Sequence, residues 1–275
     1  MKFKNEFALL SVLLLITCAG SNDGTEANDH IKFDNLVWSD EFEYAGLPDP
    51  AKWNYDVGDG CPNLCGWGNK ELEYYTSKRS KNARVENGRL IIELHREDFG
   101  TSKYTSARLT SKGKGDWKYG RFEINAKIPS GLGTWSAIWM LPTDWKYGGW
   151  PKSGEIDIME KVGYSPDTIV AAAHTGAFNG GIGTHKNGFL MVDDNDETFH
   201  KYVLEWEEEK YSVFVDNQLY FTFKNAHKTT EEWPFDKRFH LIMNIAFGGN
   251  WGGKMGLDDN ALPVKMEIDY VRVYQ

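Results

Sequence analysis

Cysteine, positive charge and long apolar runs are all scarce in this sequence of 275 residues. Three cysteines occur, and 31 Lys and Arg stand against 40 Asp and Glu, which gives a formal net charge of −9. Nucleic acids and anionic membrane surfaces bind clustered Lys and Arg, so this balance argues against both as partners. A neutral substrate suits the chain better.

Sequence motifs of several other chemistries are missing as well. The seven histidines are scattered, with no His-Glu-x-x-His pattern, and no Gly-x-Ser-x-Gly nucleophile elbow occurs. Residues 248–255 nearly match a phosphate-binding loop, but Met255 stands where a Ser or Thr must hold magnesium. Nucleotide binding is therefore disfavoured.

The apolar run from Phe7 to Ile16 has ten residues, too few to span a bilayer. Two lysines precede it, so we interpret residues 1–17 as an export signal peptide. The run ends in Leu15-Ile16-Thr17-Cys18, which resembles a bacterial lipobox with Thr in place of the usual small residue. This resemblance implies lipidation of Cys18, a flexible tether over residues 18–30 and an outer-membrane or cell-surface lipoprotein. A secreted or periplasmic protein is the alternative.

The other two cysteines, Cys61 and Cys65, lie close together in the sequence. In an exported protein, a local disulfide that stiffens the loop is favoured. A zinc site would need two further ligands, and none lies at a suitable spacing.

Short alternating runs, and no sustained helical periodicity, fill the chain from Ile31 onward. Arg121 to Ile128, for example, places apolar residues at every second position. Such runs, separated by Gly, Asn and Pro turns, predict an all-β fold, a β-sandwich jelly roll of two antiparallel sheets. No linker or repeat divides residues 31–275, so we expect one domain. The other predicted strands are 38–42, 90–94 after the Asn87-Gly88 turn, 211–215 and 219–223 around Asp216-Asn217-Gln218, 241–247, and 266–274.

Aromatic residues are abundant at 14%, with 11 Trp and 13 Tyr. Many of the tryptophans lie in glycine-rich loops, where an indole either anchors the core or stacks on a ligand. Flat rings stack on the apolar faces of sugar rings, so we expect two or three of them to line a cleft. The loops are 66–69, 131–135, 147–150 and 248–253.

The segment Glu155-Ile156-Asp157-Ile158-Met159-Glu160 carries three carboxylates within six residues. Its β-branched residues and flanking glycines predict a strand, on which Glu155 and Asp157 share one face and the isoleucines point into a core. Glu160 is out of phase, and a β-bulge near Met159 would return it to the carboxylate face. A solvated acidic edge strand is the alternative interpretation.

Two glutamates that lean inward from a bent strand bring their carboxyl groups to about 5–6 Å, near the ~5–5.5 Å of retaining glycoside hydrolases. In those enzymes one carboxylate attacks the sugar and the other donates a proton. Mutual repulsion among three acids raises at least one pKa and keeps a proton available near neutral pH.

With these residues in place, the chain resembles the laminarinase-like branch of glycoside hydrolase family 16, the endo-β-1,3-glucanases, over nearly all of residues 36–275. The resemblance is most specific at Glu155 to Glu160, where the mixed-linkage lichenases of the same family lack the extra residue. The supporting segments are 38–42, 66–71, 104–108, 135–139 and 269–274. The resemblance implies a concanavalin A-like sandwich with a substrate cleft on its concave face.

The resemblance also implies roles for individual residues. Glu155 resembles the nucleophile, Glu160 the general acid and base, and Asp157 a residue that bonds the nucleophile and tunes both. The residues that resemble substrate contacts are Asn69, Glu71, Arg108, Trp135, Trp139, His174 and Trp251. For His174 and Trp251, a place in the core is the alternative.

Catalysis of this type needs no cofactor, but many family members hold a structural calcium on the convex face. The matching positions are the carbonyls of Glu41 and Gly88 and the side chain of Asp269, and oxygen ligands suit calcium. We expect a monomer that hydrolyses laminarin-type β-1,3-glucan. The alternatives are another polysaccharide (mixed-linkage glucan, agar, porphyran or carrageenan) and a non-catalytic glycan-binding module.

Overall fold

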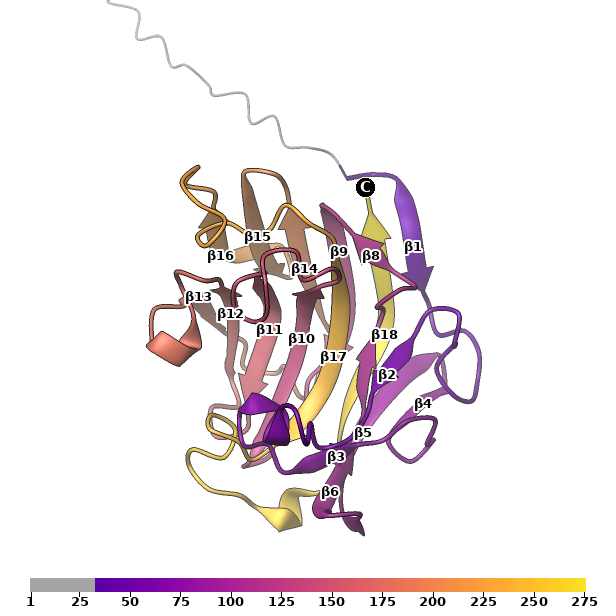
Figure 1. The fold of residues 1–275 in the computed structure, drawn as a ribbon. Helices are drawn as coiled ribbons and strands as arrows, with labels where there is room; N and C mark the ends of the chain where they lie inside the picture. The colour runs from indigo at the N-terminus through magenta and orange to yellow at the C-terminus, as the bar shows by residue number, and fades with distance from the viewer. Residues whose placement is uncertain (1–32) are drawn as a thin grey trace, which may run out of the picture. The chain divides into compact units, whose positions relative to one another are not determined.

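Two β-sheets packed face to face make up residues 33–275, the part of the chain that the computed structural model describes (Figure 1). The predicted signal peptide (1–17), tether (18–30) and lipidated Cys18 lie outside the described residues. The helical segments of residues 33–275 are three short 3-10 turns: η1 (Cys65–Gly68), η2 (Gly180–Ile182) and η3 (Asp259–Ala261). No helix in this range is long and apolar enough to cross a membrane.

The first sheet has ten strands within residues 33–275, in the order β16-β15-β14-β9-β18-β5-β6-β3, with β1 added to β18 and β4 to β5. Their bounds are β1 (Leu36–Asp40), β3 (Glu73–Tyr75), β4 (Ala83–Glu86), β5 (Arg89–Phe99), β6 (Ser102–Ser106), β9 (Gly120–Lys127), β14 (His200–Trp206), β15 (Lys210–Val215), β16 (Gln218–Lys224) and β18 (Val264–Tyr274).

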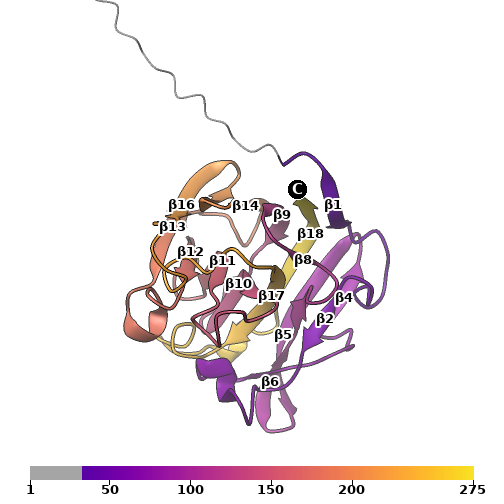
Figure 2. The ribbon, with the colours of Figure 1, turned by 45° about the horizontal axis from the view of Figure 1, so that its top comes forward.

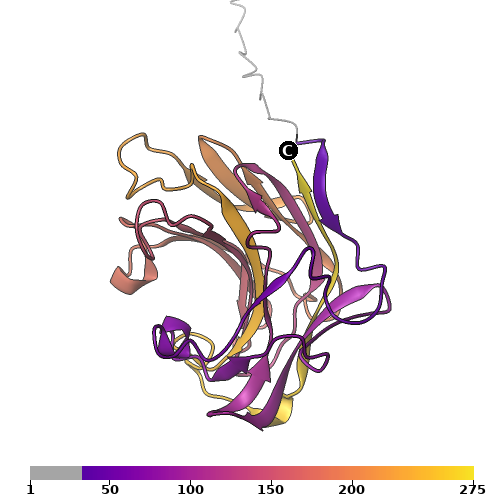
Figure 3. The same ribbon diagram turned by 45° about the vertical axis from the view of Figure 1, so that its right-hand side comes forward.

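The second sheet has eight strands within the same residues, in the order β13-β12-β11-β10-β17-β7-β2, with β8 added to β17. Their bounds are β2 (Asn54–Asp56), β7 (Arg108–Thr110), β8 (Asp116–Trp117), β10 (Thr134–Pro142), β11 (Glu155–Val162), β12 (Thr168–His174), β13 (Lys186–Met191) and β17 (Phe239–Phe247). Figure 3 shows this sheet curved, with η1 and η2 on opposite sides of its concave face.

The predicted alternation is clearest in β9, where buried and half-buried residues alternate at every position. Phe122, Ile124 and Ala126 point into the core between the sheets. By contrast, β17 is buried along its whole length because it is a central strand of the second sheet. The all-β sandwich predicted from the sequence is therefore confirmed.

Two hairpins follow from residues that tolerate a left-handed backbone. Asn87 and Gly88 have φ of 53° and 72° between β4 and β5, and Asp216 and Asn217 have φ of 47° and 70° between β15 and β16. Paired positive φ values give the two-residue turn whose twist matches antiparallel strands. Gln218, which we expected in the second turn, instead begins β16, because two residues suffice.

One strand pair differs from the purely antiparallel prediction. β3 pairs with β6 in parallel, whereas the other strand pairs within residues 33–275 are antiparallel. The chain leaves β3, forms the β4–β5 hairpin and returns along β6, and this crossover gives the parallel direction.

The two sheets converge where their edge strands β13 and β16 lie side by side (Figures 1 and 2). Gly188 in β13 sits at the contact, where a Cβ atom would stand 2.2 Å from the carbonyl oxygen of Tyr220 in β16. Only glycine lets the two backbones approach this closely.

Candidate active site

The three acids of the segment 155–160 lie on β11, and the strand carries the predicted bulge. Glu155 pairs with His174 and Asp157 with Ala172 of β12, but the next pair is Glu160 with Val170. Three steps along β11 thus match two along β12, so β11 holds one extra residue. The side chains of Ile158 and Met159 are both buried in the core. Glu160 therefore returns to the face that carries Glu155 and Asp157.

Each of the two glutamates accepts a hydrogen bond from an indole N–H. Nε1 of Trp150 donates to Oε2 of Glu155 at 3.0 Å, and Nε1 of Trp135 donates to Oε1 of Glu160 at 2.9 Å. A donor aimed at a carboxylate stabilises its charged form and fixes its orientation. Trp135 comes from the neighbouring strand β10 and Trp150 from the loop that precedes β11.

His174 faces the same acids. Its Nε2 lies 3.3 Å from Oδ2 of Asp157 and 3.8 Å from Oε1 of Glu155. Its Nδ1 accepts a hydrogen bond from the backbone N–H of Gly180 at 3.1 Å, so the ring proton lies on Nε2 and points at the carboxylates. His174 is thus a residue of the site rather than of the core.

Burial raises the pKa values of all three acids. Asp157 is 2% exposed, and desolvation raises its pKa to about 8. Desolvation first and repulsion from Asp157 second raise the pKa of Glu155 to about 8, and the same two causes raise the pKa of Glu160 to about 8. The three groups interact, so the cluster as a whole retains a proton at neutral pH while carrying negative charge.

Arg108 lies across the concave face from the acids. Paired positions run from Glu160 through Ala137 of β10 and Asn244 of β17 to Arg108 of β7, so these residues share one row of the sheet. The guanidinium carbon is 4.5 Å from the ring centre of Trp67 and 4.7 Å from that of Trp139.

Nε of Arg108 is 3.0 Å from Oδ2 of Asp56. The Asp56 carboxylate and the two indole rings together fix the orientation of the Arg108 guanidinium group.

A hydrogen-bonded chain joins Trp139 to the half-buried acid Glu71. Nε1 of Trp139 donates to Asn244 at 2.8 Å, and Asn244 donates to the hydroxyl of Tyr75 at 2.9 Å. Asn69 donates to Oε1 of Glu71 at 3.2 Å, and the Tyr75 hydroxyl lies 3.5 Å from the other oxygen of Glu71. Asn69 and Glu71 are therefore linked to one another and to the wall that carries Trp139.

Glu73 lies beneath Glu71 and is fully buried. One of its oxygens accepts the backbone N–H of Phe247 at 2.7 Å, and the side chains of Glu71 and Tyr75 lie beside it. Burial and the charge of Glu71 raise the pKa of Glu73 well above its ordinary value. Burial also raises the pKa of Glu71, so folding favours a shared proton on this pair.

Trp251 packs edge-on against Trp135, with ring centres 5.3 Å apart. The backbone N–H of Asn250 donates to the carbonyl of Asn69 at 2.7 Å, which ties the loop of Trp251 to the loop of Asn69. Trp251 thus supports the indole that bonds Glu160.

Four residues near the acids escaped the sequence analysis as site residues: Trp67, Glu73, Trp150 and Asn244. Trp67 and Trp150 belong to the glycine-rich loops that were expected to carry ligand-stacking tryptophans, so a signal was present. Glu73 and Asn244 lie in strands whose pattern looks ordinary, and only strand pairing brings them to the site.

Two groups could hold a metal. Ligand atoms of Glu155, Asp157 and His174 lie within 4.8 Å of one another, the one such group of His, Cys, Asp and Glu found among residues 33–275.

The positions expected to bind calcium lie on the other sheet. Asp40 pairs with Val271 and Leu90 with Ile268, so the end of β1 and the start of β5 flank β18 beside Asp269. Glu41 directly follows Asp40 and Gly88 lies two residues before Leu90, and one oxygen of the Asp269 carboxylate accepts a hydrogen bond from Asn125 at 3.0 Å. Two backbone carbonyls and one carboxylate are oxygen ligands of the kind that calcium takes.

The loop before η1 is closed by a covalent bond. Cys61 and Cys65 form a disulfide with a Cα–Cα distance of 4.2 Å. The ring holds the segment that carries Trp67 and Asn69 toward the concave face.

Comparison with known proteins agrees with this geometry. The model of glycosyl hydrolases family 16 matches residues 70–272. The chain is 50% identical to a beta-glucanase of Rhodothermus marinus, an alignment that covers 100% of this chain and 97% of the relative. The crystal structure of the laminarinase from Rhodothermus marinus superposes with a TM-score of 0.84 at 53% identity, over 88% of this chain and 97% of that one.

A second solved structure, SCLam, is described as a non-specific endo-β-1,3(4)-glucanase. It superposes with a TM-score of 0.82 at 46% identity, over 88% of this chain and 91% of that one. The matched family region contains the acids of β11, Arg108, Trp135 and His174, and we conclude that this chain belongs to glycosyl hydrolase family 16.

Proposed function

We propose that this protein is an endo-acting β-1,3-glucanase that hydrolyses laminarin-type glucans with retention of anomeric configuration. The observation that carries the proposal is the bulge in β11, which puts Glu155, Asp157 and Glu160 on one face, each glutamate held by an indole N–H. Two carboxyl groups that flank the glycosidic bond, about 5–5.5 Å apart, are what double displacement needs.

In the proposed mechanism, Glu155 attacks the anomeric carbon while Glu160 gives its proton to the departing glycosidic oxygen. The glycosyl ester on Glu155 is then hydrolysed by a water whose proton returns to Glu160, which restores both groups. Trp150 favours the anionic form of Glu155. Asp157 places a carboxylate beside Glu155, and the Nε2 atom of His174 lies next to both acids. These two neighbours can offset the change in charge on Glu155 when the glycosyl ester forms.

The remaining predicted contacts line the approach to these acids. Arg108, fixed between Trp67 and Trp139, offers donors to sugar hydroxyls on the non-reducing side. Asn69 and Glu71 add polar groups on that side, and Trp135 and Trp251 border the general acid.

The test is hydrolysis of laminarin followed by NMR from the first minute. We expect the β-anomer of the product to appear first, before mutarotation. First appearance of the α-anomer would reject the retaining mechanism. Glu155→Gln keeps the shape of the side chain and should abolish hydrolysis while leaving binding of laminarin largely intact.

Mixed-linkage β-glucan is the second candidate substrate, because the similar enzyme SCLam is described as acting on β-1,3(4)-glucans. Parallel assays on laminarin, mixed-linkage glucan, agar, porphyran and carrageenan rank these substrates. Binding of one of them without any turnover would favour a non-catalytic glycan-binding module.

We also propose a structural calcium ion held by the Glu41 and Gly88 carbonyls and the Asp269 carboxylate. Removal of calcium with a chelator should lower the melting temperature, and the Asp269→Asn variant should lose most of this response. An unchanged melting temperature in both would refute the site.

Lipidation of Cys18 at the outer membrane or cell surface, and a monomeric state, are further proposals. Mass spectrometry of the mature protein and fractionation of a Cys18→Ala variant test the first. Light scattering of the soluble domain tests the second.

A further inference from the structure

Strand β13 carries two exposed apolar side chains that the core does not explain. Phe189 is 72% exposed and Met191 is 58% exposed. They alternate with Gly188 and Leu190, and Leu190 packs against the core. Large apolar side chains held in water by an ordered strand often mark a binding surface.

Strand pairing places both residues on the face that carries the catalytic acids. Phe189 pairs with Val170 of β12, and Val170 pairs with Glu160 of β11. Directly paired residues project from the same face of a sheet, so Phe189, Val170 and Glu160 form one row. The same row continues to Arg108 on the far side, so Phe189 and Arg108 stand at opposite ends of it.

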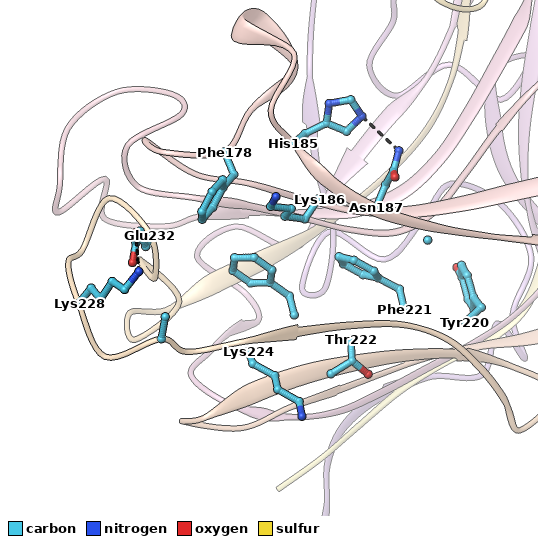
Figure 4. A pocket seen from close by; sticks show the side chains of 13 residues that line it. Phe178, His185, Lys186, Asn187, Tyr220, Phe221, Thr222, Lys224, Lys228 and Glu232 are labelled. Atoms are coloured by element: carbon cyan, nitrogen blue, oxygen red, sulfur yellow. Dashed lines mark hydrogen bonds and ion pairs between the residues drawn. The ribbon is translucent and has the colours of Figure 1, made fainter.

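A separate cavity borders β13. A surface cavity of about 660 Å³ lies between β13 and β16, and Lys186 projects into it over the ring of Phe178, with Nζ 4.8 Å from the ring centre (Figure 4). Asn187 and His185 border this cavity as well, whereas Phe189 and Met191 do not line it. Their exposure therefore belongs to the concave face alone.

Polar and aromatic groups connect Phe189 to the acids. Asn187, the next residue on the same face, donates to Nε2 of His185 at 3.2 Å (Figure 4). His185 in turn stacks on His174, with ring centres 5.4 Å apart and an angle of 11°. The concave face thus presents flat rings and hydrogen-bonding groups from the catalytic acids to its β13 edge.

We propose that Phe189, flanked by Asn187 and Met191, is a stacking platform for the second glucosyl unit on the leaving-group side of the cleaved bond. Strands are ~4.8 Å apart, so Phe189 lies about 10 Å across the sheet from Glu160. One pyranose ring is about as long as one strand spacing. The first leaving-group unit therefore covers Val170 and the second covers Phe189. Aromatic rings bind the apolar face of a sugar, and the amide of Asn187 can hydrogen-bond its hydroxyls.

This inference rests on the proposed function, because Arg108 is taken to hold the non-reducing side, which makes β13 the leaving-group side. The experiment compares Phe189→Ala with the wild-type protein on laminarihexaose and on p-nitrophenyl β-laminaribioside. The nitrophenyl group ends above Val170 and does not reach Phe189. Leu219→Ala is the matched control, since Leu219 is 53% exposed on the edge strand of the other sheet.

We expect Phe189→Ala to raise KM for laminarihexaose about fivefold, the factor that corresponds to the loss of ~1 kcal/mol of stacking. Laminarihexaose labelled with ¹⁸O at its reducing end shows by mass spectrometry which bond is cleaved. In the variant, cleavage should shift toward the bond nearest the reducing end, which releases a single labelled glucose unit. Hydrolysis of the nitrophenyl glycoside should be unchanged. Phe189→Trp should restore the wild-type pattern.

The outcomes separate the two proposals. If the wild-type protein cleaves neither substrate, the proposed function fails. If it cleaves both and Phe189→Ala behaves like Leu219→Ala, the platform is refuted while the glucanase activity stands. If Phe189→Ala instead converts a dimer into a monomer with unchanged cleavage of the hexaose, the surface is an interface between copies and the platform is likewise refuted.

Discussion

Replacing the proposed nucleophile should make the protein more stable at neutral pH while it destroys activity. Burial and the neighbouring Asp157 raise the pKa of Glu155 from 4.5 to about 8. A carboxyl whose pKa is raised by folding is protonated in both states below pH 4.5. As the pH rises from 4.5 to 8, the unfolded chain releases the proton more readily, so the folded state loses stability. Glu155→Gln removes that loss.

The size of the effect follows from the shift. The difference between 8 and 4.5 is 3.5, and each pKa unit is worth ~1.4 kcal/mol, so a lone group would cost about 5 kcal/mol. Asp157 and Glu160 share the repulsion, so removing one charge should recover only part of it, about 1–2 kcal/mol at pH 8. For a domain of this size that corresponds to a rise in melting temperature of about 2–8 °C.

The assay is thermal and urea unfolding of wild-type protein and Glu155→Gln at pH 4.5 and pH 8. The two proteins should have nearly equal stability at pH 4.5 and separate as the pH rises. Glu197→Gln, which changes an exposed carboxylate, should show no such divergence. If Glu155→Gln is no more stable than the wild-type protein at pH 8, the idea that burial destabilises the charged forms of these acids is refuted.

Three further substitutions test the groups around the acids. Trp150→Phe removes the N–H that favours the anionic Glu155, so the acidic limb of the pH–activity profile should move to higher pH and kcat/KM should fall about tenfold; an unchanged profile would contradict the assignment. Arg108→Lys loses the planar fork between two indoles, so KM for laminarin should rise about tenfold with little change in kcat; a fall in kcat alone would argue against a binding role. Glu73→Gln replaces an acid that shares a proton with Glu71 by a neutral amide and should keep stability and activity, whereas Glu73→Ala should lose about 1–3 kcal/mol of unfolding free energy by leaving the Phe247 N–H unpaired; equal loss in both variants would show that Glu73 is charged.

Local sequence patterns were sufficient to predict part of the strands, the two hairpin turns and the bulge, but not strands such as β12, β13 and β14. Alternation marks β9 because one of its faces is in the core, and Asn87-Gly88 marks a turn because both residues adopt a positive φ without strain. The alternation of residues in the segment 155–160 was enough to predict a strand in which Glu160 is out of phase with the other two acids. These features depend on interactions between near neighbours in the chain.

The remaining features of the site depend on contacts between residues far apart in the chain. Asn244 lies 105 positions from Trp139 and 169 from Tyr75, yet its amide joins the two. Phe189 reaches the concave face only because β13 pairs with β12 in a particular register, and a shift by one residue would have turned it into the core. Sequence periodicity assigns a residue to one of two faces but does not say which face meets the acids.

The bulge in β11 is best understood from what a regular strand would bury. If the same residues paired regularly with β12, without the bulge, Glu160 would project into the core that contains Ile158, and an unpaired carboxylate there would cost several kcal/mol. The bulged strand gives up one position of regular pairing with β12, which costs about 1 kcal/mol, and keeps the side chains of both Ile158 and Met159 buried. The conformation that favours the core is therefore the same one that gathers the three acids on the concave face, so folding and assembly of the site require the same local geometry.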